Sequence, residues 1–375
     1  MERIIVPKVI ECSRLINDKE NVLDKLSPIN KLCLGDYICD EFFRTDTDIS
    51  KYIGSIKDDE KKKNKVWEML IKNAYLSSGE VFNKSEVYLL TRKNAVILKS
   101  SDYKDNEYYR DIKLDKDIRV GSYILTKNKY LVGEMMTYDI GEIIENNISV
   151  PKLGIWQDEF EYITLGESGN AWMTITPNEI NTMKKPIENA CGRVLTFGLG
   201  LGYFGYLASL KENVESVTIV EKSDVVIDIF TKYILPQFKT KDKINIVKAD
   251  MFEYIKDMDI EKEFDYVFVD IWQDCTEVYL YLKARKALKN VKNVIVDYWI
   301  SGAIEQILLD DILFDYSELL IGNTEGSYSS IDEPILTKRA VQRALKELDV
   351  YKLDIKNEVL NINYMLPKIL EAMDE

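Results

Sequence analysis

Five short apolar runs separated by helical patterns constrain the fold of this 375-residue chain more than any other feature. The runs begin at residues 194, 217, 244, 266 and 294, with helical patterns at residues 203–211, 224–233 and 276–288. Short, nearly continuous apolar strands that alternate with helices are typical of a parallel sheet covered on both faces. Because crossovers between parallel strands are right-handed, the pattern predicts the α/β class, with a doubly wound, mainly parallel, Rossmann-like sheet.

The chain around this pattern is predicted to divide into further regions. Residues 1–83 are expected to form an N-terminal helical region and residues 84–175 a β-rich hairpin domain. The Rossmann-like domain is assigned to residues 176–321, and a C-terminal helical extension to residues 322–375. A chain of this length agrees with more than one domain, at about 100–200 residues per domain.

Three hairpins are predicted in the β-rich region from paired apolar runs around turn residues. The pairs are residues 87–91 with 95–98, residues 122–126 with 130–132, and residues 160–165 with 171–175. A helix is then expected to begin at Pro177, with Thr176 as its cap and Glu179 reaching back to complete a capping box.

Charge and composition exclude several classes of function. Fifty Lys and Arg residues against 64 Asp and Glu residues give a net charge of −14. This balance argues against broad binding to nucleic acid or to an anionic membrane, because both require an excess of positive charge. The chain has no histidine, which excludes histidine metal sites and Ser–His–Asp triads, so that Asp, Glu, Lys, Tyr, Cys or water must carry any proton. No metal site is expected.

The remaining features indicate a soluble, cytoplasmic protein. The five cysteines are scattered without a CxxC motif, which favours reduced thiols. The N-terminal residues have no long apolar segment of the signal-peptide type, and no run approaches 18 apolar residues. A homodimer is left open.

The predicted ligand site lies at the carboxyl ends of the strands, where strand order reverses in open α/β sheets. The first strand is followed by Gly198, Gly200 and Gly202, whose missing β-carbons allow a sharp turn and the close approach of a ligand. The helix that starts near Tyr203 supplies free backbone N–H groups.

Each later strand is followed by an acid. Glu221, at the end of the second strand, is placed to accept hydrogen bonds from two ribose hydroxyls. Asp250 is placed to accept from an adenine amino group, with Met251 against the ring, and Asp270 follows the fourth strand. Together these residues predict a site for a nucleoside-bearing ligand.

Two reading frames of the glycine loop suggest different ligands. Residues 200–205 match GxGxxG, which is typical of NAD binding. That frame requires the strand to run through Gly198, and a glycine inside a buried strand weakens it. A loop that starts at Gly198 instead gives G-x-G-x-G directly after the strand, which suits S-adenosylmethionine.

In this second frame residues 193–300 resemble a class I S-adenosylmethionine-dependent methyltransferase, and more narrowly its spermidine synthase-like branch. The resemblance rests on residues 194–202, 217–224, 246–254 and 264–270. It implies that Glu221 holds the ribose, that Asp250 and Met251 hold the adenine, and that the loop of Gly198, Gly200 and Gly202 lies under the methionine part.

The sequence also departs from the family. Thr196 and Leu201 stand where an acid is common in methyltransferases and in polyamine synthases, respectively. The synthases carry a DxxDP-like pair after the fourth strand, whereas here Asp270 and Asp274 are four residues apart with Trp272 between them. An Asn-Pro-Pro-Tyr-type motif, which would indicate methylation of nucleic-acid bases, is absent.

The leading hypothesis is a methyltransferase acting on a small-molecule or peptide acceptor. Asp270 is the first candidate to orient or deprotonate the acceptor and Asp274 the second; Trp272 is either a wall of the acceptor pocket or an ordinary core residue. The nearest alternative is an aminopropyltransferase that uses decarboxylated S-adenosylmethionine, and it needs both acids in one acceptor channel. An NAD oxidoreductase and a non-catalytic nucleoside-binding module are the remaining alternatives.

Overall fold

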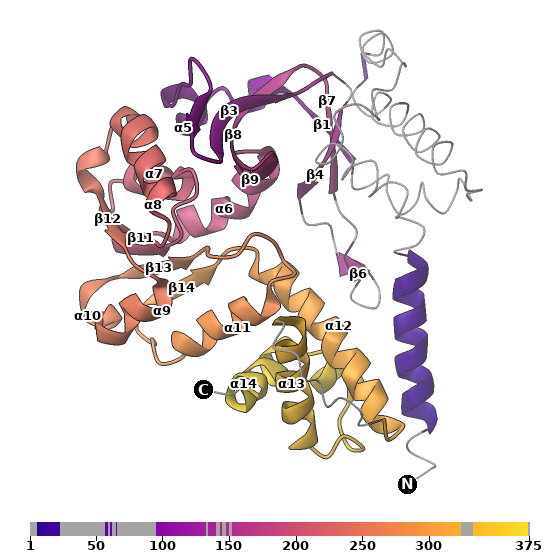
Figure 1. The fold of residues 1–375 in the computed structure, drawn as a ribbon. Coiled ribbons are helices and arrows are strands. Elements are labelled where there is room, and N and C mark those ends of the chain that lie inside the picture. Colours follow the sequence, from indigo (N-terminus) through magenta and orange to yellow (C-terminus); the bar gives the residue numbers. More distant parts are fainter. Residues whose placement is uncertain are drawn as a thin grey trace.

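The computed structural model describes most of the chain from residue 95 onward and one helix before it (Figure 1). The described residues are 6–22, 57, 58, 61, 65, 95–132, 134–139, 143–144, 148–149, 152–323 and 333–373. Most of the predicted N-terminal helical region, the strand predicted at residues 87–91 and residues 324–332 lie outside this set.

A five-stranded sheet of order β12-β11-β10-β13-β14 forms the centre of the molecule, and every neighbouring pair in it is parallel. Its strands are β10 (Gly192–Phe197), β11 (Val214–Glu221), β12 (Ile244–Lys248), β13 (Tyr266–Val269) and β14 (Ile295–Tyr298). The predicted doubly wound, Rossmann-like fold is therefore confirmed. Strand order reverses between β10 and β13, which lie side by side although β11 and β12 separate them in the sequence.

Helices cover both faces of this sheet because successive strand residues point to opposite sides. Val194 packs on one face with α6 (Pro177–Asn189), α7 (Tyr203–Ser209) and α8 (Asp224–Ile229). Leu195 packs on the other face with α11 (Val278–Ala287) and α12 (Ser301–Leu320). Figure 1 shows the sheet between these two groups of helices. Burial on both faces explains why the strands are almost continuously apolar.

The described residues of the β-rich part before α6 form three further sheets. One is antiparallel, with the order β2-β3-β8-β9. Its strands are β2 (Ile118–Val120), β3 (Tyr123–Tyr130), β8 (Phe160–Glu167) and β9 (Asn170–Thr174). The second sheet has the order β1-β7-β4, formed by β1 (Ala95–Leu98), β4 (Met135–Asp139) and β7 (Lys152–Trp156). The third is the separate pair of β5 (Ile143–Ile144) and β6 (Ile148–Ser149).

The three predicted hairpins have different outcomes. The hairpin of β8 and β9 is confirmed, with a tight turn at Ser168 and Gly169, both of which have positive φ. The hairpin predicted around residues 127–129 is wrong, because these residues lie within the single long strand β3. The described partner of β1 is β7, which runs parallel to it.

The predicted first residue of α6 is confirmed, but its predicted capping box is not. Pro177 begins the helix and Thr176 precedes it in an extended conformation. The capping box is wrong, since the Thr176 side chain makes no capping hydrogen bond. Glu179 instead accepts a hydrogen bond from Thr174 Oγ1 at 2.7 Å.

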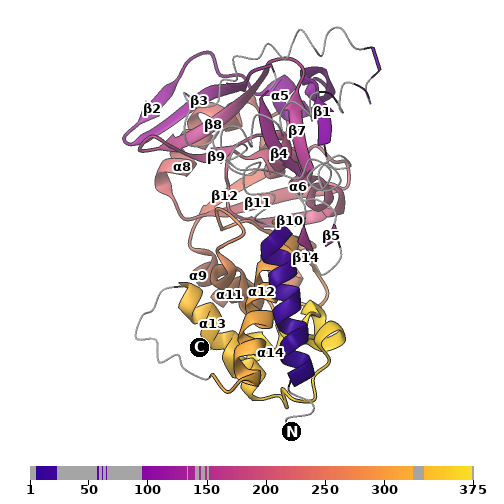
Figure 2. The same ribbon diagram turned by 90° about the vertical axis from the view of Figure 1, so that its right-hand side faces the viewer.

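The helix of residues 6–22 packs against the C-terminal helices (Figure 2). Its Cys12 and Leu15 are buried in the core that α12, α13 (Glu333–Lys346) and α14 (Ile362–Ala372) share with the sheet. Lys8 donates to the carbonyl oxygens of Tyr351 and Leu353. The predicted domain boundaries at residues 83/84, 175/176 and 321/322 stay predictions. No helix within the described residues is long and apolar enough to cross a membrane.

Candidate functional site

A cavity of about 390 Å³ opens at the carboxyl ends of the central strands. This volume lies within the range of roughly 300–1,000 Å³ that is usual for small-molecule sites. Residues at or just after the ends of all five strands of the central sheet contribute to the lining, among them Gly198, Glu221, Asp250, Asp270 and Trp299. The cavity therefore lies where strand order reverses, as expected for a ligand site in an open α/β sheet.

The glycine loop begins directly after β10, which ends at Phe197. Gly198, Gly200 and Gly202 all have positive φ, which L-residues with side chains rarely adopt. A β-carbon on Gly198 would lie 1.8 Å from the carbonyl oxygen of Asp270, so only glycine allows the two strand ends to meet. Gly200 lines the cavity, whereas Gly202 lies outside the lining and packs against Phe230.

Glu221 is buried, with 8% of its surface exposed, and its carboxylate holds the glycine loop. One carboxylate oxygen accepts from the backbone N–H of Leu199 at 3.1 Å, and the other accepts from that of Ser223 at 2.7 Å. Because a carboxylate offers about four lone-pair sites, acceptor capacity is left for a ligand.

Asp250 and Met251 lie side by side at the end of β12 and both line the cavity. Asp250 is exposed, and its Oδ1 accepts from the backbone N–H of Phe252 at 2.8 Å as the N-cap of α9 (Met251–Tyr254). The Met251 side chain is buried and presents an apolar surface to the cavity.

Asp270 follows β13, and its backbone N–H donates to the carbonyl of Phe197 at 2.8 Å. This bond fixes the residue beside the glycine loop, where its half-buried side chain lines the cavity. Burial raises the pKa of Asp270 to about 7, and the negative charge of Glu221 adds to the rise. The side chain can therefore exchange a proton near neutral pH.

Glu179, which the sequence suggested only as a helix cap, is a second carboxyl group of the cavity. Burial raises its pKa to about 8; the hydrogen bond from Thr174 opposes the rise, and the charge of Asp270 increases it. No pattern at strand ends signals this residue, because it comes from the first turn of α6. The turn from β9 into α6 aims that part of the helix at the sheet edge.

Asp274 does not line the cavity, in contrast to the other predicted acids. Its Oδ1 accepts from the backbone N–H and the hydroxyl of Thr276, at 2.7 and 2.6 Å. These contacts stabilise the turn that leads into α11. A role for Asp274 in catalysis stays a prediction, and it has no support from the position of the side chain.

Aromatic side chains form much of the remaining wall. Trp272 is buried in the core and also lines the cavity. Its role as a wall of the acceptor pocket stays a prediction. Its Nε1 donates to the carbonyl of Trp299 at 3.2 Å. Trp299 and Trp172 were not foreseen, because neither stands in a recognisable motif; both line the cavity, as does Tyr203.

The lining carries more negative than positive groups. Among the described residues, the carboxyl groups of the lining are those of Glu179, Glu221, Asp250, Asp270 and Glu277, and its one basic residue is Lys222. Within the described residues, no group of three or more Cys, Asp or Glu side chains is arranged to hold a metal ion. The excess of carboxyl groups in the lining favours a positively charged ligand, and aromatic faces are available to it.

No family model matches the chain, and neither does any curated protein. Among solved structures the chain is similar to the spermidine synthase from Thermotoga maritima, with 15% identity over 40% of this chain and 59% of that chain and a TM-score of 0.30. It is also similar to a spermidine synthase in complex with the transition-state analogue AdoDATO, with 14% identity over 46% and 68% of the two chains and a TM-score of 0.29. The first match spans less than two thirds of the synthase's length, so the function has to be argued from the site itself.

Proposed function

We propose that this protein binds a sulfonium nucleoside of the S-adenosylmethionine type and transfers its methyl group to an amine-bearing acceptor. A single observation carries the proposal: the glycine loop, Glu221, Asp250 with Met251, and Asp270 surround one cavity at the strand-order reversal.

The residues of the cavity fit such a ligand. The lack of a side chain at Gly198 and Gly200 leaves backbone accessible to the methionine part. Glu221 would accept from the ribose hydroxyls, and Asp250 from the adenine amino group with Met251 against the ring. The sulfonium, when bound, supplies an already activated alkyl group, so the protein's task is to align the acceptor and exclude water.

Asp270 and Glu179 support an amine as the acceptor. An alkylammonium group carries a positive charge at neutral pH and must lose a proton before its nitrogen can attack. Asp270, with a pKa of about 7, is suited to take that proton near pH 7. Glu179, with a pKa of about 8, is mostly protonated at that pH and becomes a base only at higher pH. Trp172 and Trp299 add aromatic faces that attract a cation.

Aminopropyl transfer is the second candidate, and one observation favours it. Asp270 does not share the cavity with Asp274, but it does share it with Glu179, which gives the acceptor site two carboxyl groups. The two candidates differ in the donor that they use, S-adenosylmethionine or its decarboxylated form.

Calorimetry with four ligands tests the proposal: S-adenosylmethionine, decarboxylated S-adenosylmethionine, methylthioadenosine and NAD. We expect S-adenosylmethionine to bind most tightly and NAD not to bind. A preference for the decarboxylated form would favour aminopropyl transfer, and binding of NAD alone would overturn the assignment. Tight nucleoside binding without turnover of any amine would indicate a non-catalytic module.

Replacement of Glu221 tests the ribose contact. We expect S-adenosylhomocysteine to raise the melting temperature of the wild type, and Glu221→Ala to lose most of that rise. Because this variant also leaves the N–H groups of Leu199 and Ser223 without an acceptor, each shift is measured against the same variant without ligand. Glu221→Gln keeps one side-chain oxygen that can accept from these N–H groups, so its melting temperature without ligand shows how much of the loss in Glu221→Ala comes from folding.

Glu253→Ala is the matched control, because this exposed glutamate of α9 lies outside the cavity lining. The control should keep the full rise in melting temperature. An unchanged rise in Glu221→Ala would contradict the proposed role.

A further inference from the structure

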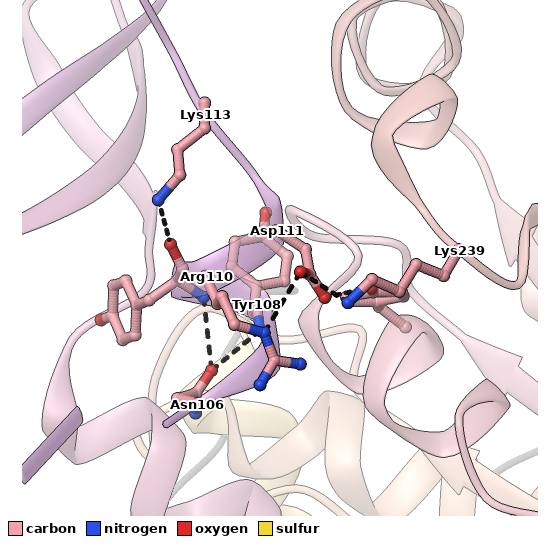
Figure 3. Close-up of polar contacts among 8 residues, drawn as sticks. Asn106, Tyr108, Arg110, Asp111, Lys113 and Lys239 are labelled. Atoms are coloured by element: carbon pink, nitrogen blue, oxygen red, sulfur yellow. Dashed lines mark hydrogen bonds and ion pairs between the residues drawn. The ribbon is translucent and has the colours of Figure 1, made fainter. Parts of the chain in front are cut away.

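The short helix α5 (Glu107–Asp111) comes from the β-rich part of the chain but packs against α7, which begins directly after the glycine loop. Its Tyr108 is fully buried, and the hydroxyl donates to the carbonyl oxygen of Leu201 at 2.7 Å. Figure 3 shows Tyr108 amid the polar groups of α5. A residue nearly a hundred positions earlier in the sequence thus contacts the centre of the loop.

The peptide that Tyr108 contacts needs an external partner. Leu201 stands between Gly200 and Gly202, both with positive φ, so its carbonyl belongs to neither β10 nor α7. Among the described residues no other donor reaches this oxygen. The N–H of the same peptide, that of Gly202, donates to the carbonyl oxygen of Leu199 at 2.9 Å, so the hydroxyl of Tyr108 fixes the carbonyl end of a peptide that the loop itself holds at the other end.

A hydrogen bond from Asn106 holds Tyr203, which also lines the cavity. Asn106 Nδ2 donates to the hydroxyl of Tyr203 at 2.8 Å, and Asn106 Oδ1 caps α5 by accepting from the backbone N–H groups of Tyr108 and Tyr109. The rings of Tyr108 and Tyr203 lie with centroids 5.4 Å apart. One end of α5 thus holds both the loop and the first residue of α7.

The other end of α5 is fixed independently of the loop. Tyr206 donates to Asp111 Oδ2 at 2.7 Å, and Lys239 pairs with Oδ1 of the same carboxylate at 2.8 Å (Figure 3). The Gln237 side chain exchanges two hydrogen bonds with the backbone of Lys113, at 2.9 and 3.1 Å. These contacts keep α5 in place even if the contact with Leu201 is lost.

We propose that Tyr108 is a positioning residue of the nucleoside site: it fixes the Leu201 peptide so that the glycine loop is already in its binding conformation before the ligand arrives. The inference rests on the proposed function, because it assumes that the loop binds the nucleoside ligand. A loop ordered in advance loses less conformational freedom on binding, which increases affinity.

The test compares two tyrosine variants that each remove one hydroxyl from the interface of α5 with α7. Tyr108→Phe removes the contact with Leu201, whereas Tyr206→Phe removes the contact with Asp111, which keeps Lys239. We expect both to lower the melting temperature without ligand. Only Tyr108→Phe should raise the Kd for S-adenosylhomocysteine, by about threefold to tenfold for one hydrogen bond.

A second variant covers the case in which Tyr108→Phe folds poorly. Asn106→Ser keeps a capping oxygen for α5 but is too short to reach the Tyr203 hydroxyl, so it should also weaken binding. Equal Kd values in the wild type, Tyr108→Phe and Asn106→Ser would overturn the inference while leaving the proposed function intact. Absence of binding in the wild type would overturn both.

Discussion

Glu179 and Asp270 face one cavity, and within the described residues no lysine or arginine pairs with either carboxyl group. Half-buried carboxylates without a cationic partner are costly to ionise, because the protein removes part of their hydration, and both pKa values therefore rise toward neutrality. A bound cation would supply the missing charge and lower both pKa values. The two carboxyl groups therefore favour the binding of a positively charged ligand.

Glu179 is predicted to make the stability of the ligand-free protein depend on pH. Its pKa is about 8 in the folded chain, against about 4.3 for an unfolded glutamate. The folded state thus binds more protons between these values, and the free energy of unfolding falls as the pH rises through that window. Glu179→Gln keeps an acceptor for Thr174 but does not titrate, so its melting temperature should fall less between pH 5 and pH 8.5. Parallel pH profiles for the wild type and the variant would rule out this explanation.

Residues at strand ends were predictable from the sequence, but this second acid was not. Gly198, Glu221, Asp250 and Asp270 follow apolar runs, and the parallel sheet brings all strand ends to one edge. Glu179 reaches the same cavity through the packing of α6 on the sheet, and the order of residues along the chain does not encode that angle.

At the scale of elements, the glycine loop combines two different demands on glycine. Gly198 needs both its positive φ and its missing β-carbon, because the carbonyl of Asp270 occupies the space. Gly200 needs only its φ of 54°, since a β-carbon there would meet no atom within 4 Å. Gly198 is therefore required for the two strand ends to pack together, whereas the space beside Gly200 stays open at the cavity.

Three alanine variants separate these demands. Gly198→Ala should destabilise most, because the new β-carbon would overlap with backbone. Gly200→Ala should cost about 1–2 kcal/mol of stability through its left-handed conformation and also weaken nucleoside binding. Gly121→Ala, in the turn before β3 with φ 60° and open space, is the matched control. Gly121→Ala should lose similar stability and keep full affinity for the nucleoside. Calorimetry measures the affinity of both variants. If Gly200→Ala binds the nucleoside as tightly as Gly121→Ala, the loop does not touch the ligand.

The sequence of residues 127–129 predicts a turn, although these residues lie within the strand β3. Residues 127–129 are exposed, and their polar sequence resembles a turn. They pair with β8, but β2 extends only along residues 123–125, so this part of β3 is an edge of the sheet as far as the described residues form it. The strands of the central sheet carry a stronger signal, because helices cover both of their faces.

At the scale of the whole molecule, the helix of residues 6–22 completes a core made largely from the C-terminal half. Cys12 and Leu15 are buried among residues of α11, α12, α13 and α14. Lys19 pairs with Asp310 of α12. Sequence periodicity identifies each helix, but it carries no information about partners as distant in sequence as Lys19 and Asp310, which are 291 residues apart, so this packing could not be predicted.

Leu15→Ala is predicted to destabilise the protein by about 2–5 kcal/mol, because it leaves a cavity in this shared core. Ile10→Ala, on the same helix but 62% exposed, should change stability by less than about 0.5 kcal/mol. Denaturant unfolding measures both values. Equal stability of the two variants would show that the helix does not pack on the C-terminal helices.

The pairing of Lys8 with carbonyl groups 343 and 345 residues later has a consequence for synthesis on the ribosome. At about 5–20 residues per second, roughly 17–70 s pass between translation of this lysine and of its acceptors. A helix of this length is marginal alone in water, so the nascent segment holds Cys12 and Leu15 without their partners throughout that interval. Chaperone capture of the growing chain is therefore expected to persist until α13 and α14 have been translated, and slow decoding of the codons for these helices would prolong it.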